Sequence, residues 1–462
     1  MRFKIIHTND LHSHFEAFAK AVTVIKKEKN EHTLLLDGGD FADFKSIELQ
    51  GTRGIAAIEL LTEAGYDALT VGNNEMFNGV DTLEHMASDG RIPFISANLS
   101  RKDRTSIKGL LSSTIIEKDG IRFFITGTSP DMGVFCDGLG IHMTDFKRAI
   151  QEELEKNKGL YDVGIILNHV GTFADFELIG KLDGIDVILS AHDHQLFPEV
   201  KVHEGIIWNS AGNYGEHVGV IEIEVTEAGV SLIDSKMIET KDFEGDESIL
   251  SILQKNKEMA VEILSKPLYS LDEPLWHDVI EENPISNLIA DGLRDMLGAD
   301  LGLINSGIVN AGAFGFISRK KLIETCPSPL NPTYFEIQGK DLLKALEDSL
   351  DSQVCMADGR GPGFRGRFVG RLHVSGAAII HDGKKILHMT IGNEPVEEER
   401  WYRVASSDYL QRGSGYPSLA HNRNDRYLAE EIKDVIEIYA KRSDFVKRAA
   451  RKRWVEKSRI KV

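Results

Sequence analysis

The sequence predicts an α/β protein with two domains, in which a layered sandwich of strands and helices precedes a smaller α/β domain. Three observations support this prediction. The chain has 462 residues, which is too long for one ordinary domain. Short apolar strands alternate with helical segments up to about residue 240, as in mixed α/β sandwiches. A polar, helical stretch at 241–275 then separates this region from a second mixture of strands and helices.

Residues 1–240 are predicted to form the larger domain. Its strands are short runs rich in apolar and β-branched residues, and many end in Gly, Asn, Asp or His. The segments between them carry apolar residues at helical spacing. Lys118-Asp119-Gly120 is typical of a hairpin turn. The predicted strands are 3–8, 33–36, 68–71, 93–97, 114–117, 121–126, 163–167, 187–190, 206–209, 218–225 and 230–237, and the predicted helices are 17–29, 54–64 and 144–157.

Residues 241–275 are predicted to form a helical linker that contains two helix-breaking prolines. Residues 276–440 are predicted to form the second domain. It opens with a helix at 284–296, and the Gly- and Arg-rich stretch 358–367 is typical of a mobile loop. Further strands are predicted at 301–304, 334–337, 372–374, 386–391 and 401–405, and a further helix at 339–350.

The C-terminal residues 441–462 form a basic tail, with ten Lys and Arg against two Asp and Glu. The rest of the chain is strongly acidic, because the net charge of the whole is −18. We expect the tail to be a solvated basic helix that lies on the acidic body. Contact with an anionic surface is the alternative.

Composition is that of a globular protein and argues against several classes. Apolar residues make up 42% and charged residues 27% of the chain. No apolar run reaches the roughly 18 residues of a membrane helix, and no leader precedes the first strand. The acidic net charge argues against nucleic acid as a partner. We therefore expect a cytoplasmic protein, monomeric or homodimeric, that binds a small molecule and keeps its three cysteines as free thiols.

Oxygen and imidazole donors follow five of the predicted strands, and they are Asp10, His12, Asp40, Asn73, His169, His192 and His194. Because open α/β sheets hold ligands at the carboxyl ends of their strands, we expect these side chains to lie together. Such a mixed set suits Mn, Fe, Zn or Co rather than Ca. Seven donors exceed the needs of one ion and suit two ions, about 3.5–4 Å apart, that share a carboxylate. Asp40 is the natural bridge.

The order of these motifs resembles the calcineurin-like metallophosphoesterases, in particular the 5′-nucleotidase branch with its C-terminal nucleotidase domain. A looser match covers 287–291, 402–410 and 413–416. The resemblance implies a four-layer β-sandwich flanked by helices for residues 1–240 and a substrate-binding domain for 276–440. The motifs that carry it are Asp10-x-His12, Gly38-Gly39-Asp40, Gly72-Asn73-x-Glu75, Asn168-His169 and His192-x-His194.

The resemblance also implies a function. The protein would be a metal-dependent hydrolase of a phosphate ester, with a nucleotide or nucleotide-like substrate and a role in nucleotide catabolism. The attacking group would be a hydroxide that bridges two divalent ions. Asp10, His12 and His194 would hold the first ion, Asn73, His169 and His192 the second, and Asp40 would bridge them.

One position departs from the family pattern. The family has Gly-Asn-His followed by Asp or Glu, whereas this chain has Gly72-Asn73-Asn74-Glu75. Asn74 can donate a hydrogen bond, but it cannot deliver a proton to a leaving group. Losing a general acid costs about 10²–10⁴ in rate, so we expect good leaving groups to suffer least. His217 is a candidate replacement, with a structural role as the alternative.

The substrate domain also departs from the pattern. Nucleotidases commonly have Asn-Gly-Gly-x-Arg after a strand, whereas Asn305 begins Asn-Ser-Gly-Ile-Val here, without the arginine. Tyr409 could stack on a base or pack in the core. Ser414 aligns with an Asp expected to bind ribose. Arginines at 360, 365, 367 and 412 could replace the missing anion contact. The candidate substrate residues are Asn305, Tyr409, Arg412, Ser414 and Tyr416.

Two other functions are open. Asn74 is compatible with a catalytically weakened, metal-dependent sensor or ligand-binding protein. A hydrolase of a sulfur-containing ester is the second alternative, because a branch of the same superfamily resembles one. Turnover of phosphate esters in the presence of Mn²⁺ separates the hydrolase from the sensor.

Overall fold

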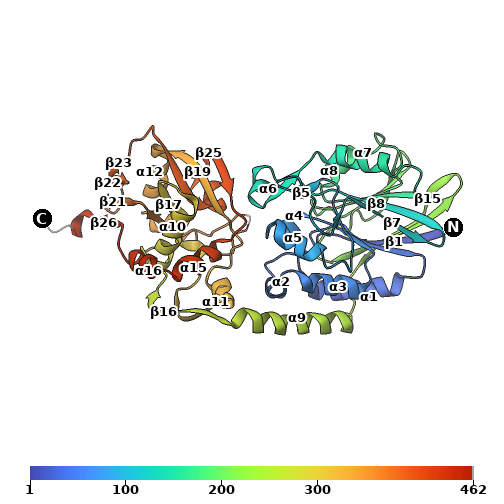
Figure 1. Cartoon of the computed structure of the whole chain (residues 1–462), viewed down its shortest axis with the longest axis horizontal. Coiled ribbons are helices and arrows are strands. Elements are labelled where there is room, and N and C mark those ends of the chain that lie inside the picture. The colour runs from blue at the N-terminus through green and yellow to red at the C-terminus, as the bar shows by residue number, and fades with distance from the viewer. Residues whose placement is uncertain (362, 460–462) are drawn as a thin grey trace. The chain divides into compact units, whose positions relative to one another are not determined.

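The computed structural model describes residues 1–361 and 363–459, and it divides into two compact units, Met1–Glu262 and Ile263–Val462 (Figure 1). Each unit has its own sheets and its own buried core. Among the described helices, none combines the length and the apolar character needed to cross a lipid bilayer.

The first unit is built on two sheets. One has seven strands in the order β15-β14-β1-β2-β3-β4-β6, and β1, β2, β3, β4 and β6 run parallel. The other has six strands in the order β12-β13-β11-β10-β8-β7, with β13, β11, β10 and β8 parallel. The strand bounds are β1 Arg2–Thr8, β2 Thr33–Asp37, β3 Ala68–Thr70, β4 Phe94–Ile95, β6 Leu110–Leu111, β7 Ser113–Lys118, β8 Ile121–Thr126, β10 Val163–Asn168, β11 Val187–Ser190, β12 Lys201–His203, β13 Ile206–Asn209, β14 His217–Thr226 and β15 Gly229–Glu239.

Alternating side chains on these strands build the layers. Ile5 and Leu34 of the seven-stranded sheet share one core with Ile165 and Leu189 of the six-stranded sheet. Ile166 faces the other way and packs with α7, while α1 contacts β14 and α3 on the far side of the other sheet. The predicted α/β sandwich of four layers is confirmed. The helices of this unit are α1 Phe15–Glu28, α2 Ile47–Thr52, α3 Ile55–Ala64, α4 Asn73–Met76, α5 Val80–Ala87, α6 Val134–Gly138, α7 Phe146–Lys156 and α8 Thr172–Phe176, and β5 Leu99–Arg101 pairs with β9 Ile141–Met143.

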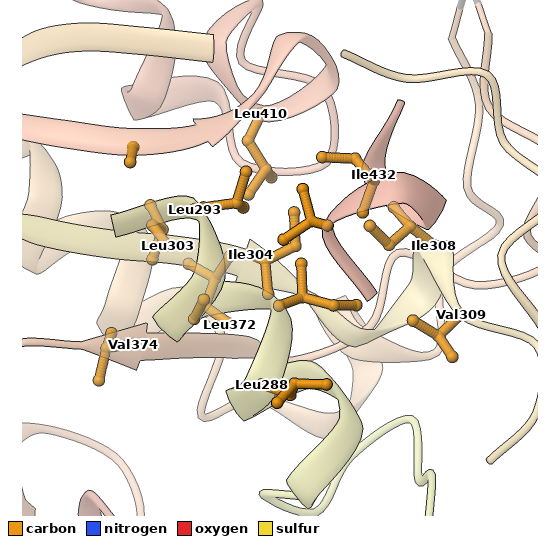
Figure 2. Close-up of a cluster of buried hydrophobic side chains, with 14 of the residues drawn as sticks. Leu288, Leu293, Leu303, Ile304, Ile308, Val309, Leu372, Val374, Leu410 and Ile432 are labelled. Atoms are coloured by element: carbon orange, nitrogen blue, oxygen red, sulfur yellow. The ribbon is translucent and has the colours of Figure 1, made fainter. Parts of the chain in front are cut away.

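The second unit contains a five-stranded sheet, β20-β17-β24-β19-β25, a four-stranded sheet, β23-β22-β21-β26, and a two-stranded ribbon, β16-β18. Helix α10 (Pro284–Leu297) contacts β17, β20 and β24, and its Leu288 and Leu293 belong to the core shown in Figure 2. Its start is fixed by the Asn283 side chain, which accepts a hydrogen bond from the Ser286 backbone.

The other elements of the second unit complete its layers. Its strands are β16 Pro267–Leu275, β17 Leu301–Asn305, β18 Ala313–Ser318, β19 Pro332–Gln338, β20 Leu372–Ser375, β21 Ala377–His381, β22 Ile386–Ile391, β23 Glu394–Pro395, β24 Trp401–Ser407, β25 Asn422–Tyr427 and β26 Trp454–Glu456. Its helices are α11 Arg319–Thr325, α12 Gly339–Asp348, α13 Ser352–Cys355, α14 Asp408–Gln411, α15 Ile432–Ala440 and α16 Ser443–Ala449, with 3₁₀ turns η1 Ser306–Ile308, η2 Pro417–Ala420 and η3 Lys457–Arg459.

The predicted linker at 241–275 is helical only in part. Helix α9 (Glu247–Ser265) fills its centre, and the unit boundary falls inside this helix. The prediction of helix is wrong for Pro267–Leu275, which form strand β16 and pair with β18. Two features explain this: Tyr269 and Leu271 are covered between exposed neighbours, at the two-residue spacing of a half-buried strand, and Pro274 cannot donate a helical hydrogen bond.

The prediction of a solvated basic tail is also wrong for the described residues of 441–462. Phe445 and Trp454 are buried, and β26 extends the four-stranded sheet beside β21. The guanidinium of Arg453 lies 2.8 Å from the Asp291 carboxylate. The apolar residues between the charges therefore make this segment part of the second unit rather than an appendage.

Candidate metal centre

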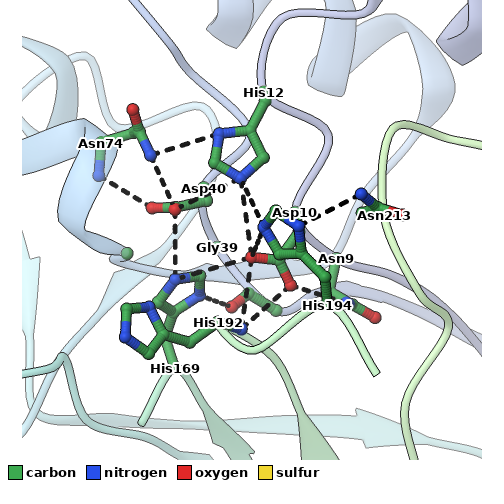
Figure 3. Close-up of polar contacts among 12 residues, drawn as sticks. Asn9, Asp10, His12, Gly39, Asp40, Asn74, His169, His192, His194 and Asn213 are labelled. Atoms are coloured by element: carbon green, nitrogen blue, oxygen red, sulfur yellow. Dashed lines mark hydrogen bonds and ion pairs between the residues drawn. The ribbon is translucent and has the colours of Figure 1, made fainter. Parts of the chain in front are cut away.

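The predicted donors lie at the carboxyl ends of neighbouring strands. Asp10 and His12 follow β1, Asp40 follows β2, and Asn73 opens α4 after β3. His169 follows β10, and His192 and His194 follow β11 in the other sheet. Figure 3 shows the carboxylates of Asp10 and Asp40 among the four imidazole rings.

Two groups of three side chains each have the geometry to hold a metal ion. Asp10, His12 and His194 offer donor atoms that all lie within 4.8 Å of one another. Asp40, His169 and His192 form a second group by the same measure. The first group consists of the three ligands expected for the first ion, and the second contains His169 and His192, expected for the second ion, together with Asp40, while Asn73 is in neither group.

The carboxylates of Asp10 and Asp40 connect the two groups. Asp40 Oδ2 lies 3.6 Å from His12 Nε2 and 3.4 Å from His169 Nε2. Asp10 Oδ1 lies 3.5 Å from His194 Nε2 and 3.8 Å from His169 Nε2. Either carboxylate could therefore contact both groups, whereas the sequence pointed to Asp40 alone.

The backbone at this site is strained. Asp10, His12, Asp40, His192 and His194 all have positive φ, between 49° and 87°. Side chains other than glycine rarely adopt this left-handed conformation, and such residues cluster at functional sites. Glycine provides the space around them, because a Cβ on Gly72 would lie 2.1 Å from Asp40 Oδ1.

Several donor atoms of the site are oriented so that they could bind a metal ion. The Nδ1 atom of His169 lies 2.7 Å from the carbonyl oxygen of Gly38, to which it donates, so Nε2 is turned toward the carboxylates. Nε2 of His169 and Oδ1 of Asn73 are buried and make no hydrogen bond with described residues. Buried polar atoms are normally satisfied, so these two orphans fit a bound cation. His12 Nε2 and His194 Nε2 also converge, 3.0 Å apart.

The electrostatics of the site favour metal binding. Burial lowers the pKa of His12 and of His192, so both rings are neutral, the form that ligates metals. Burial also lowers the pKa of His169, but Asp40 and Asp10 more than offset this and raise it to about 10, so the two carboxylates favour a positive charge at this ring, which a metal ion could supply in place of the proton. Burial acts to raise the pKa of Asp40, but His169 and His12 more than offset this and hold it below its ordinary value.

Asn74 points into the metal centre. Its backbone N–H donates to Asp40 Oδ1 over 2.8 Å, and its Nδ2 donates to Asp40 Oδ2 over 2.7 Å. The same Nδ2 lies 3.3 Å from His12 Nδ1. Asn74 therefore orients two of the predicted donors, and no imidazole occupies its position.

Sequence reasoning missed the residues that support these donors. Asn9 donates to Asp10 Oδ2 over 2.8 Å, and Asn213 lies 3.1 Å from Nδ1 of His194. Tyr214 packs edge-on against the rings of His12 and His194. Residues 210–214 follow another strand, β13, of the six-stranded sheet, so their place near the site could be predicted, but the directions of their side chains could not.

The buried carboxylates of Glu75 and Asp175 stabilise the loops that carry the predicted donors. Glu75 accepts hydrogen bonds from the backbone of Asp40, Ala42 and Gly72. Asp175 accepts from Asn168 and from Ser190, which lie at the ends of β10 and β11. Each buried carboxylate thus fastens two loops that carry predicted donors.

The candidate substrate residues of the second unit are mostly structural. Asn305 donates to the carbonyl of Val369 over 2.6 Å, and Tyr416 donates to that of Gly370 over 2.6 Å. Tyr409 is fully buried, with its ring stacked on Phe364 at 4.6 Å, so neither face is open to a base. Arg412 is paired with Asp408, and Ser414 is half-buried near Gly361.

An open cavity of the second unit offers other contacts. It has a volume of about 430 Å³, and its lining includes His277, Asn310, Arg365 and Arg367 but no carboxylate among the described residues. The two guanidinium groups form no ion pair within the described part of the chain, and the guanidinium of Arg365 donates to the Phe364 carbonyl. Gly307 and Gly366 approach each other closely there, since a Cβ on Gly366 would lie 1.9 Å from the Gly307 carbonyl.

Comparison with known proteins agrees with this architecture. Residues 3–196 match the calcineurin-like phosphoesterase family, and residues 266–421 match the 5′-nucleotidase C-terminal domain. The chain is 28% identical to an uncharacterized metallophosphoesterase, YunD, of Bacillus subtilis, over 93% of this chain and 97% of that protein. It is 25% identical to the trifunctional nucleotide phosphoesterase YfkN of Bacillus subtilis, over 93% of this chain and 33% of that protein.

Solved structures share the fold of the whole chain. The NAD nucleotidase of Haemophilus influenzae has a TM-score of 0.65 at 16% identity and covers 99% of this chain and 97% of its own. A 5′-nucleotidase precursor of Thermus thermophilus has a TM-score of 0.57 at 21% identity and covers 99% of both chains.

The fold and the donor groups define a metal-dependent phosphoester hydrolase. More particularly, the chain belongs to the calcineurin-like phosphoesterases and carries the C-terminal domain of the 5′-nucleotidases. Calcineurin-like phosphoesterases use a dinuclear metal centre, and candidate ligand groups for one are present.

Proposed function

We propose that the protein hydrolyses a nucleotide or nucleotide-like phosphate ester at a centre of two divalent ions. The observation that carries this proposal is the convergence of two donor groups on the carboxylates of Asp10 and Asp40. Asp40 would lie between the two ions, which we expect to be Mn, Zn, Fe or Co. Asp10, His12 and His194 would hold one ion, and Asn73, His169 and His192 the other.

Two divalent ions held there would supply Lewis-acid chemistry, since they lower the pKa of a bound water and balance phosphoryl charge. The chain's own part is to hold the donors in place. Asn9 and the backbone N–H of His192 fix the Asp10 carboxylate, so that its Oδ1 faces the imidazoles. The Gly38 carbonyl holds the His169 ring with Nε2 inward.

Asn74 cannot protonate the leaving group. Its amide is bonded to Asp40 and His12, and an amide does not give up a proton at neutral pH. The leaving group must therefore depart as an anion or take a proton from water. We propose that the enzyme favours esters with acidic leaving groups, such as a phosphate or a phenol.

The cavity of the second unit supports an anionic substrate. Among the residues that the structure describes, Arg365 and Arg367 line it without a carboxylate partner, in a chain that carries an excess of acidic residues. Unpaired guanidinium groups are suited to a phosphate or a carboxylate. Two similar proteins, the trifunctional nucleotide phosphoesterase YfkN and an NAD nucleotidase, support the same class of substrate.

The test is a turnover assay with Mn²⁺ on a panel of phosphomonoesters, phosphodiesters and nucleotides. We expect release of phosphate or of the alcohol from at least one nucleotide, and none after chelation. If the protein binds metal but turns over no member of the panel, the hydrolase proposal fails and the sensor alternative, which the Asn74 contacts favour, takes its place.

A further inference from the structure

An aromatic pair lies one helical turn beyond Asn74 in the first unit. Phe77 directly follows α4, and its helical φ and ψ continue the turn that carries Asn74. Residues three apart on a helix share one face, so Phe77 lies on the side of α4 from which Asn74 points into the metal centre (Figure 3). The ring of Phe77 packs edge-on against the ring of Phe135 on α6, with 5.9 Å between the ring centroids.

This apolar surface is partly open to solvent. Phe77 is 36% exposed, and Val134, which precedes Phe135 on α6, is 52% exposed. Phenylalanine is usually buried, and exposed apolar groups that lie together mark interaction sites. Apolar and aromatic side chains beside a few polar groups are also typical of small-molecule sites. Because Asn74 adjoins the pair, the occupant that the geometry favours is a part of the substrate.

The charges around the pair argue against an anionic occupant. Segments 71–80 and 127–140, which carry the two rings, contain no Lys or Arg. Asp131 and Asp137 of the second segment are exposed. Lys102 reaches this segment, but its ammonium group donates to the backbone carbonyl of Asp137 over 3.1 Å. A phosphate group would therefore meet no basic side chain of these segments, whereas an uncharged ring would meet apolar surface.

We propose that Phe77 and Phe135 bind the leaving group of the substrate, and that this leaving group carries an uncharged aromatic ring rather than a phosphate. The inference rests on the proposed function and narrows it, because it separates a phenol from a phosphate as the acidic leaving group. Phe77 is then a specificity-determining residue. Its ring contacts the part of the substrate that departs, and offset or edge-on contact between aromatic rings is favourable.

The first test compares 2-naphthyl phosphate with phenyl phosphate, using the full-length protein and Mn²⁺. The two leaving groups are of nearly equal acidity, so a difference in kcat/KM reports contact with the ring. We expect the wild type to favour the naphthyl ester about fivefold, because the second ring adds apolar area that Phe77 removes from water. Phe77→Ala should bring the ratio close to one, and Phe77→Leu, which stays apolar, should keep most of it.

Ile115→Ala is the matched control, since Ile115 is 39% exposed on β7 of the same unit. It should leave the ratio unchanged, and the metal content of every variant should match that of the wild type. Equal kcat/KM for the two esters in the wild type, or a preference that survives Phe77→Ala, overturns this inference and leaves the hydrolase in place. If neither ester nor any nucleotide is hydrolysed, the proposed function fails as well.

A second test adds a cation beside the leaving group. Phe77→Lys should raise kcat/KM for inorganic pyrophosphate, whose leaving group is phosphate, relative to phenyl phosphate, and it should lower the preference for the naphthyl ester. Phe77→Met, which adds no charge, is the control for the loss of the ring. A ratio of pyrophosphate to phenyl phosphate that is the same in Phe77→Lys and in Phe77→Met would show that the leaving group does not reach this position.

Discussion

Asp40 belongs to the second donor group, and its Oδ2 also lies 3.6 Å from His12 Nε2 of the first group, so we propose that it bridges the two ions. Asp40→Asn removes the carboxylate charge while keeping the side chain's size, so we expect activity to be lost and at least one ion to be missing from the purified protein. Metal content by mass spectrometry and the turnover assay measure both effects. Asp43→Asn, in the same loop but paired with Lys45, should retain metal and activity. Full activity of Asp40→Asn would show that Asp40 is not the bridge.

Asn74 offers a test of leaving-group protonation. Asn74→His restores an imidazole that can act as a general acid, a contribution of about 10²–10⁴ in rate. We expect the gain on alkyl phosphates, which are poor leaving groups, to exceed the gain on nitrophenyl phosphate. Asn74→Gln, which keeps an amide, controls for the change in shape. Equal gains on both substrates would contradict the argument.

The predicted donors could be found from sequence because each follows an apolar strand, and parallel strands bring their ends to one edge. The orienting contacts could not. Asn213 reaches His194 from a loop after β13, and Asn74 turns its amide inward rather than toward solvent. Such directions depend on backbone angles, including the positive φ of Asp10 and Asp40, which residue type alone does not dictate.

At the scale of elements, Asp175 on α8 ties β10 to β11 and should make stability depend on pH. Burial raises its pKa from 3.8 to about 7, so the folded state holds a proton that the unfolded state releases. The resulting stability is complete below pH 4 and is lost as pH rises through about 7, by up to about 4 kcal/mol. Urea unfolding of metal-free protein between pH 4 and 8 measures this loss.

Asp175→Asn mimics the protonated acid, so the decline of stability with pH should flatten in this variant. Asp162→Asn, which changes a surface carboxylate paired with Arg122, is the control and should not flatten it. Parallel curves for the wild type and Asp175→Asn would mean that Asp175 is ionised in the folded protein throughout this range.

The C-terminal segment is part of the second unit's core, and Trp454 tests this. It is 5% exposed on β26, beside β21, and the guanidinium of Arg371 lies over its ring at 4.6 Å. Trp454→Ala should cost about 3–5 kcal/mol of unfolding free energy, measured by urea denaturation of the full chain. Trp401→Ala, at a position that is 36% exposed, should cost clearly less. A negligible cost for Trp454→Ala would restore the view of a solvated tail.

The central strands β2, β10 and β11 of the first unit were predictable because they are buried on both faces and consist of continuous apolar runs. Strand β16 and the tail were not, because charge and proline obscure their apolar positions. Leu271 and Leu275 stand among Asp, Glu and Pro, and Trp454 follows three basic residues. Their burial depends on partners distant in sequence, β18 for one and β21 for the other.

At the scale of the whole molecule, the sequence is rich in acidic residues, and several of them are buried close together in the first unit. The side chains of Asp10, Asp37, Asp40, Glu75 and Asp175 are all buried in the first unit around the strand ends. Burial raises the pKa of Asp37 to about 8 and that of Glu75 to about 7. These two acids therefore bind protons readily, whereas His169 and His12 hold the pKa of Asp40 below its ordinary value, so Asp40 is a buried carboxylate that a divalent ion would stabilise.

The most direct test of this account is anomalous X-ray diffraction from crystals of the full-length protein grown with Mn²⁺. We predict two peaks about 3.5–4 Å apart. One should lie against Asp10, His12 and His194, the other against Asn73, His169 and His192, with Asp40 touching both. A single peak, or none at these residues, would contradict the central claim.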